Sequence, residues 1–156
     1  MATQTIGAEA LIHNSRLDSL NPLIGTWTVT GSHPMVPGKT FHGRTSFERH
    51  AGGAFILMHS EMDEPEIPSA VAILGSDQDP DRITMLYFDE RGVSRKFDVS
   101  VDGDTVLWRR ENAKFSQEMK LTVAAAGDRI DQTGRMSQDG GPWEADLALT
   151  YVRAAD

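Results

Sequence analysis

From residue 25 onward the chain alternates short β-rich segments with turn signals, and this pattern constrains the fold more than any other feature. No helical pattern of about 10–15 residues lies between the segments, which argues against a parallel α/β sheet. Short, evenly spaced strands divided by turns predict an all-β sandwich or barrel. The expected strands are Thr26–Ser32, Thr40–His50, Ala54–Asp63, Ala70–Ser76, Arg82–Asp89, Val93–Val101, Asp104–Glu111, Lys114–Val123, Asp128–Ser137 and Trp143–Arg153.

Five turns in the second half predict the strand register. They are Glu90-Arg91-Gly92, Asp102-Gly103, Asn112-Ala113, Ala126-Gly127 and Asp139-Gly140. They pair Tyr87 with Arg95, Arg95 with Arg110, Phe97 with Trp108, Val99 with Val106, Trp108 with Gln117, Met119 with Gly134, and Met136 with Trp143. All five turns then agree on one apolar face: Ile83, Met85, Phe97, Val99, Val106, Trp108, Phe115, Met119, Leu121, Val123, Ile130, Met136, Trp143, Ala145, Leu147, Leu149 and Tyr151. Glu144 and Asp146 fall on the opposite, polar face. A slip of one residue would turn every side chain to the wrong face.

The first half leaves two registers open. The turn at Ala51-Gly52-Gly53 allows either of two sets of side chains to face inward. One set is Phe55, Leu57, His59 and Glu61, and the other is Ile56, Met58, Ser60 and Met62.

A long meander with one apolar face must bury that face, and closing the sheet on itself does so while removing both edges. We therefore expect a closed antiparallel up-and-down barrel of about ten strands. About eight strands enclose enough room for side chains or one small ligand, and ten leave more space. Residues 1–8 are expected to form a loose tail and residues 9–156 one domain. Within it, Glu9–Leu20 is expected to form a short amphipathic helix that caps one end and is stopped by Pro22.

Composition excludes several classes of function. The chain has no cysteine, so disulfides and thiolate chemistry are excluded. Its net charge of −8 comes without a basic stripe, so no nucleic-acid partner is expected. The longest apolar runs, 54–58 and 70–74, are too short to span a bilayer. The first seven residues lack the pattern of a signal peptide, so a cytoplasmic location is expected.

The segment Leu23-Ile24-Gly25-Thr26-Trp27 resembles the Gly-x-Trp opening strand of the calycin superfamily, which includes lipocalins and fatty-acid-binding proteins. Four further segments resemble a bacterial family of unknown function in that superfamily: Gly52–Phe55, Tyr87–Val93, Asp139–Trp143 and Thr150–Arg153. The resemblance covers Leu17 to Arg153. It implies a lipocalin-like barrel whose preceding helix plugs the floor, and it brings no activity and no catalytic residue.

Heme-binding barrels of the nitrobindin type are fold relatives in which a histidine near the C-terminal end ligates iron. No histidine follows His59 in this chain. Heme is therefore a disfavoured cofactor, and no other cofactor is expected.

The most informative cluster on the apolar face contains one phenol and two guanidiniums, those of Tyr87, Arg95 and Arg110. Such groups are costly on an apolar wall without a partner, and a carboxylate supplies one through bidentate hydrogen bonds. The predicted ligand-binding residues are Tyr87, Arg95, Arg110, Trp108, Phe97, Gln117, Met85 and Trp143. The alternative is that the charged groups lie at a solvated rim, paired with Asp89, Glu90 or Glu111.

The predicted function is binding of a small hydrophobic or amphipathic molecule, with a carboxylate, inside the barrel. Three alternatives remain: an isomerase- or cyclase-type enzyme using His59, Glu61 or Tyr87 as acid or base, a heme-binding barrel, and a filled barrel that serves as an interaction module. His59 and Glu61 have i,i+2 spacing and face one side, but no third ligand can be placed, so no metal site is predicted. The β-rich edges are compatible with a homodimer.

Overall fold

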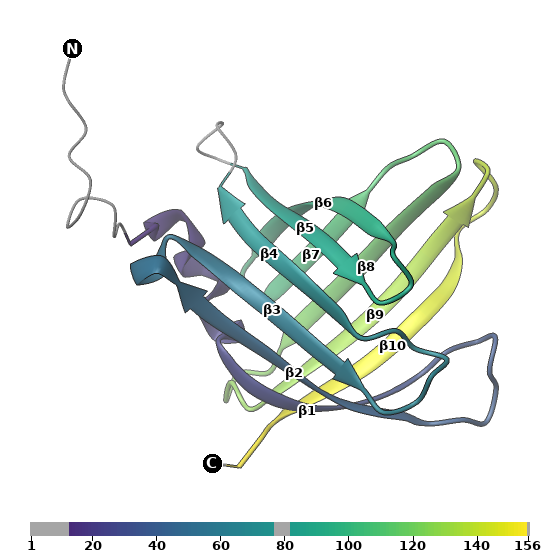
Figure 1. Cartoon of the computed structure of the whole chain (residues 1–156), viewed down its shortest axis with the longest axis horizontal. Coiled ribbons are helices and arrows are strands. Elements are labelled where there is room, and N and C mark those ends of the chain that lie inside the picture. The colour runs from purple at the N-terminus through teal and green to yellow at the C-terminus, as the bar shows by residue number, and fades with distance from the viewer. Residues whose placement is uncertain (1–12, 77–81, 156) are drawn as a thin grey trace.

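A computed structural model describes residues 13–76 and 82–155, and these residues form a closed antiparallel barrel (Figure 1). Each strand pairs with its neighbours in sequence, and β1 pairs with β10 to close the ring. The strands are β1 (Gly25–Ser32), β2 (Phe41–His50), β3 (Phe55–Met62), β4 (Ala70–Ser76), β5 (Ile83–Asp89), β6 (Ser94–Asp102), β7 (Thr105–Arg110), β8 (Phe115–Val123), β9 (Arg129–Gln138) and β10 (Glu144–Arg153). The predicted ten-strand up-and-down barrel is confirmed.

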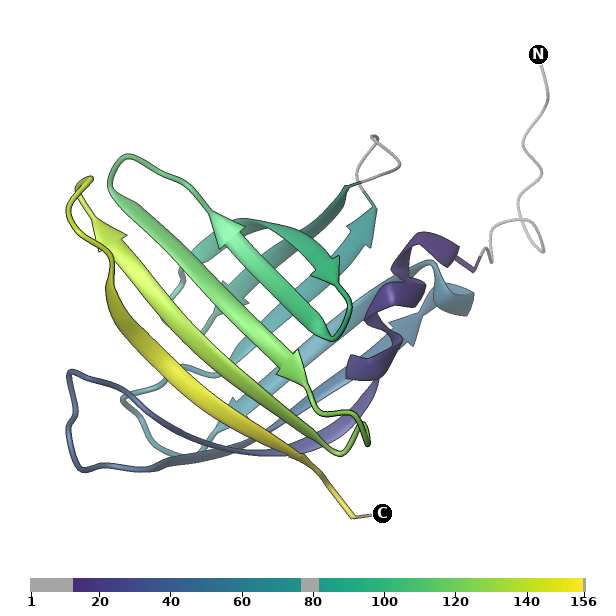
Figure 2. The ribbon, with the colours of Figure 1, turned by 180° about the vertical axis from the view of Figure 1, so that it is seen from behind.

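A 3₁₀ helix, η2 (Ser15–Leu23), lies across one end of the barrel (Figure 2). It buries Leu17, Leu20 and Leu23 in the same apolar core as the strands. The helix expected at Glu9–Leu20 is a 3₁₀ helix over Ser15–Leu23 instead. The first four residues of the expected range lie outside the described part of the chain. Pro22 does not stop the helix, because the fixed backbone angle of proline is close to that of a 3₁₀ turn.

The first-half register is resolved by β3. Ile56, Met58, Ser60 and Met62 face the interior, whereas the intervening residues face outward. A short 3₁₀ turn, η3 (Ala51–Gly53), joins β2 to β3 and sets His50 opposite Phe55. Gly52 and Gly53 both adopt positive φ there, of 70° and 98°, which glycine tolerates best.

The second-half register agrees with the turns at β5–β6 and β8–β9, where Tyr87 pairs with Arg95 and Met119 with Gly134. At β6–β7 the loop is 103–104 rather than 102–103, so Trp108 pairs with Val99 instead of Phe97. At β7–β8 the loop is longer than predicted, and Trp108 pairs with Met119. Each correction moves the partner by two positions, so every side chain keeps its predicted face.

A β-bulge between β9 and β10 overturns one part of the prediction. Ala145 pairs with Arg135 and Ala148 with Thr133, so two residues, 146 and 147, oppose Gly134 alone. A Cβ on Gly134 would lie 2.7 Å from the Leu147 carbonyl oxygen, so glycine permits this close approach. The extra residue turns Asp146 inward and leaves Trp143 outside, the reverse of the expected facing.

The apolar core fills the barrel at the η2 end. Its largest fully buried side chains include Trp27, Phe47, Leu74 and Leu121, and the Trp27 Nε1–H donates to the Leu23 carbonyl at 2.9 Å. The plug and the first strand are thus joined by a buried hydrogen bond. Within the described residues, no helix is both long and apolar enough to cross a membrane.

We expect Leu20→Ala to lower the free energy of unfolding by about 2–5 kcal/mol, because it leaves a void in a fully buried contact. The matched control is Leu86→Ala, whose side chain is 44% exposed on the outer face and whose loss is expected to change stability by about 0.5 kcal/mol or less. Urea unfolding of both variants measures the difference. Equal effects would show that η2 does not belong to the cooperative core.

Candidate functional site

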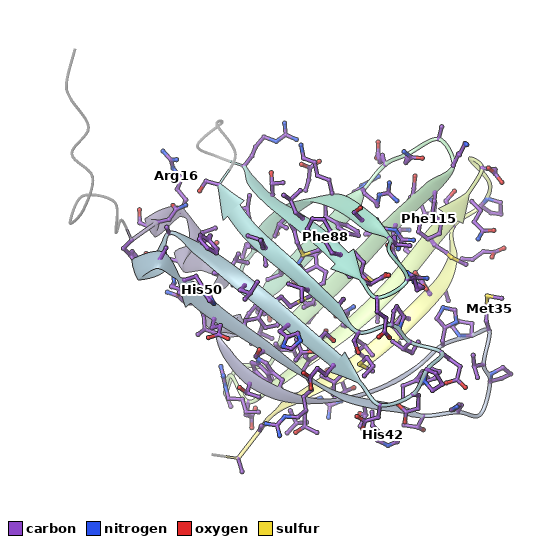
Figure 3. The ribbon with its side chains drawn as sticks, in the orientation of Figure 1. Arg16, Met35, His42, His50, Phe88 and Phe115 are labelled. Carbon is purple, nitrogen blue, oxygen red and sulfur yellow. The ribbon has the colours of Figure 1, made fainter. Side chains whose placement is uncertain are left out.

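A cavity of about 500 Å³ occupies the half of the barrel opposite η2. This volume lies within the range of roughly 300–1,000 Å³ typical of small-molecule sites. Its mouth is bordered by the loops at 33–40 and 63–69, which supply His33, Met35 and Ile67 to the lining. Met35 and Phe115 lie at this end of the molecule, and Arg16 of η2 lies at the other (Figure 3). The cavity therefore has a floor and a mouth at opposite ends.

Methionine dominates the apolar part of the wall. Every methionine in the described part of the chain lines the cavity: Met35, Met58, Met62, Met85, Met119 and Met136. Their unbranched, polarisable side chains adapt to ligands of different shape. Phe97 and Trp108 add flat apolar surface.

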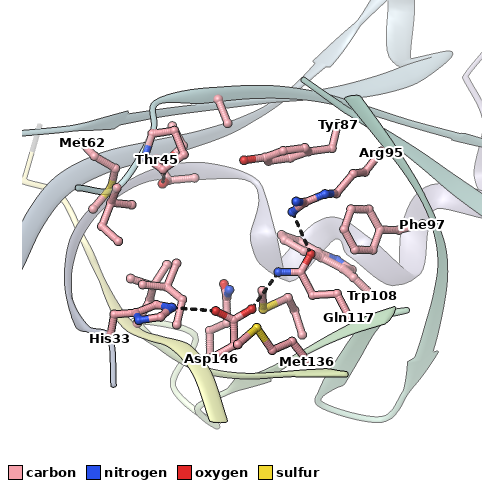
Figure 4. Close-up of a pocket in the computed structure, with 18 of the residues that line it drawn as sticks. His33, Thr45, Met62, Tyr87, Arg95, Phe97, Trp108, Gln117, Met136 and Asp146 are labelled. Carbon is pink, nitrogen blue, oxygen red and sulfur yellow. Dashed lines mark hydrogen bonds and ion pairs between the residues drawn. The ribbon is translucent and has the colours of Figure 1, made fainter. Parts of the chain in front are cut away.

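Arg95 lies at the start of β6 and projects into the cavity near its mouth (Figure 4). Its Nη1 donates to the Gln117 Oε1 at 3.2 Å, and its guanidinium lies 4.7 Å from the Phe115 ring centroid. Among the described residues, it forms no ion pair with a carboxylate. Burial lowers the pKa of Arg95, and the neighbouring positive charge of Arg91 lowers it further. The guanidinium is therefore held in the cavity wall with its charge uncompensated.

A hydrogen-bonded chain holds Arg95 in place, as the dashed lines of Figure 4 show. Asp146 accepts from His33 Nε2 at 2.9 Å and from Gln117 Nε2 at 2.8 Å. The Nδ1 of His33 accepts from the Met35 backbone N–H at 3.0 Å, so the proton of the neutral ring sits on Nε2. Because Asp146 takes the amide nitrogen of Gln117, the amide carbonyl must face Arg95. Both oxygens of Asp146 are thus engaged.

Tyr87 belongs to a second polar group at the end of β5. Its hydroxyl donates to Asp89 Oδ2 at 2.9 Å, and Arg91 Nη2 donates to the same oxygen at 2.7 Å. Burial raises the pKa of Tyr87, and the Asp89 carboxylate raises it further. Burial would by itself raise the pKa of Asp89, but the hydrogen bonds from Arg91 and Tyr87 lower it to about 2. The expected alternative, pairing with Asp89, therefore holds for Tyr87 and not for Arg95.

Known proteins resemble this chain in fold and not in sequence family. Neither a protein-family model nor a curated protein matches the chain. The crystal structure of Rv2717c from M. tuberculosis is similar with a TM-score of 0.63 and 18% identity, over 92% of this chain and 100% of that one. The S-type phycobiliprotein lyase CpeS from Guillardia theta is similar with a TM-score of 0.57 and 13% identity, over 99% of both chains. The chain therefore shares its barrel fold with these two structures.

The predicted ligand-binding residues divide into two groups in this barrel. Six of the eight line the cavity: Met85, Tyr87, Arg95, Phe97, Trp108 and Gln117. Arg110 pairs with Gln117 at the last position of β7 but is not part of the lining. Trp143 lies on the exterior, where its ring centroid is 4.7 Å from the Arg135 guanidinium. The β10 bulge explains why Trp143 is outside.

His59 and Glu61, the two weak catalytic candidates, are on the outer surface of β3. Their side chains are 50% and 69% exposed, and His59 Nε2 lies 3.6 Å from Glu61 Oε1. The inward register of Ile56 and Met58 forces this placement. The prediction that these two residues act in the lumen is therefore wrong.

The polar lining residues that the sequence did not predict include His33, Gln132 and Asp146. His33 lies in a loop, where periodicity carries no information. Asp146 was assigned to the outer face because the bulge has no signature in composition. Gln132 had a usable signal, since it alternates with Ile130 and Gly134 on the inner face of β9.

We expect Asp89→Asn to destabilise the protein at neutral pH by about 1 kcal/mol, a discounted figure because Arg91 is half exposed. The lowered pKa of Asp89 means that this stabilisation is present above the unfolded value of 3.8 and is lost as the pH falls towards about 2. The wild-type and Asp89→Asn unfolding free energies should therefore converge between about pH 4 and pH 2. Urea unfolding across this range measures it.

The control is Asp98→Asn, which removes an exposed ion pair with Arg82 and should have little effect at any pH. A constant gap between wild type and Asp89→Asn at all pH values would contradict the assigned role of the Asp89 carboxylate.

Proposed function

We propose that this protein binds a small amphipathic molecule inside its barrel, with a carboxylate head on Arg95 and an apolar body along the methionine-lined wall. The observation that carries the proposal is the charge balance of the cavity. Among the lining residues that the structure describes, Arg95 is the arginine without a carboxylate partner, since Arg91 pairs with Asp89. An anionic head supplies the missing partner.

The acidic groups of the lining do not oppose an anion at Arg95 directly. Glu66 pairs with Lys39 of the other mouth loop at 2.5 Å, and this contact lowers the pKa of Glu66. Asp146 accepts two hydrogen bonds from His33 and Gln117. The free guanidinium donors of Arg95 therefore remain the favourable site for an incoming carboxylate.

The hydrogen bonding and protonation of the side chains in the lumen favour binding over catalysis. His33 uses both ring nitrogens in hydrogen bonds, and the raised pKa of Tyr87 keeps its phenol protonated. Neither group is poised as a general base. Heme is disfavoured for a related reason, because the Nδ1 and Nε2 of His33 are already engaged. The phycobiliprotein lyase shares the fold at 13% identity, which supports the barrel and points to no particular ligand.

We expect Arg95→Met to weaken binding of palmitate, or of an anionic fluorescent dye that competes with it, by about 10- to 100-fold. The reason is the loss of a charge-assisted hydrogen bond worth about 1.5–3 kcal/mol. The matched control is Arg109→Met, which removes an outward-facing arginine from the adjacent strand β7 and should leave affinity unchanged. Isothermal titration or dye displacement measures both. Equal affinity in wild type and Arg95→Met would refute the head-group assignment.

A further inference from the structure

Gln132 is a buried amide that faces the cavity. Its residue is 4% exposed, it lies on the inner face of β9, and it lines the cavity wall. Its carbonyl oxygen accepts from the Tyr151 hydroxyl at 2.6 Å. Its NH₂ group has no acceptor among the described residues, and its nitrogen is not one of the fully buried side-chain atoms that lack a partner. It is therefore an unused donor that points into an enclosed space.

Tyr151 fixes which end of the Gln132 amide faces the cavity. The phenol is buried at 3% exposure, and burial raises its pKa, so the hydroxyl keeps its proton. Within the described residues, the Gln132 carbonyl is the one acceptor of that proton. Turning the amide over would leave a buried hydroxyl without an acceptor, which is costly. The NH₂ group is thus presented to the lumen by a fixed neighbour.

The Gln132 donor lies deeper in the barrel than Arg95. Gln132 pairs with Leu121 of β8, whereas the partner of Arg95, Gln117, lies four residues earlier on the same strand and face. Four residues of strand correspond to about 13 Å. The cavity therefore has one hydrogen-bond donor near its mouth, on Arg95, and another towards its floor, on Gln132.

We propose that the ligand is an oxygenated amphipathic acid, with a carbonyl or hydroxyl oxygen in the deeper part of its chain that accepts from the Gln132 amide. This inference rests on the proposed function and narrows it to a chemical class. A plain alkyl chain would leave the Gln132 donor without a partner once water is displaced, whereas an oxygen at this depth satisfies it. Gln132 is then a residue that determines specificity, and Tyr151 is its positioning residue.

The test compares palmitate with a set of oxo-palmitates whose keto group moves along the chain. Wild type is expected to bind one or two adjacent positional isomers about two- to tenfold more tightly than palmitate, the size of one net hydrogen bond. Gln132→Met, which keeps the length of the side chain and removes the amide, is expected to abolish this preference and retain palmitate affinity. Gln138→Met removes a glutamine at the mouth end of the same strand and should leave the preference intact.

The outcomes separate the two proposals. Failure of wild type to bind palmitate and every oxo-palmitate would overturn the proposed function itself. Palmitate binding that depends on Arg95, together with equal affinities across the oxo series, would overturn only the inference about Gln132. A preference for one oxo-palmitate isomer that remains in Gln132→Met would also overturn only the inference about Gln132. If that variant does not fold, Tyr151→Phe provides the test, because an amide free to turn should lose most of the preference while palmitate affinity remains.

Discussion

Closure of the ring between β1 and β10 is the constraint on which the cavity depends. Without it, both strands would be open edges and the inner face would be exposed to water. Arg153 reinforces this seam from the last strand. Its guanidinium lies 4.2 Å from the Trp27 ring centroid and donates to the backbone carbonyls of Pro22, Ile24 and Gly127. One side chain thus ties the plug, the first strand and the β8–β9 turn to the closing strand.

Turn chemistry and alternation were sufficient to predict the barrel and most of its inner face. The two hairpins with corrected loops, at 103–104 and after Arg110, show why faces are more predictable than partners. A loop that moves by one residue changes each partner by two positions, and a strand has a period of two. The single-residue bulge at 146–147 is different. An unpaired extra residue changes the register by one position, so the β10 side chains between the preceding turn and the bulge face the opposite side.

The residues of the candidate site also differ in how well the sequence predicts their positions. Tyr87, Arg95 and Gln117 were predictable because each lies on a strand whose register follows from nearby turns. His33 was not, since its position depends on where a long loop meets β10 across 113 residues of sequence. Arg110 was predicted on the correct strand and face, but strand register does not show how far along the strand the cavity lining extends. Arg91 pairs with Asp89, only two residues away in sequence, whereas the lack of a carboxylate beside Arg95 depends on the tertiary structure.

The plug at one end of the barrel gives the lumen a direction. Leu17, Leu20 and Leu23 close the floor, and Arg95 stands at the opposite opening. On the proposed function, an elongated amphipathic ligand would enter tail first, and its charged end would bind last, near the surface. The depth from the opening to the leucine floor would then limit the length of the ligand. A ligand with too long an apolar tail could not place its carboxylate against Arg95.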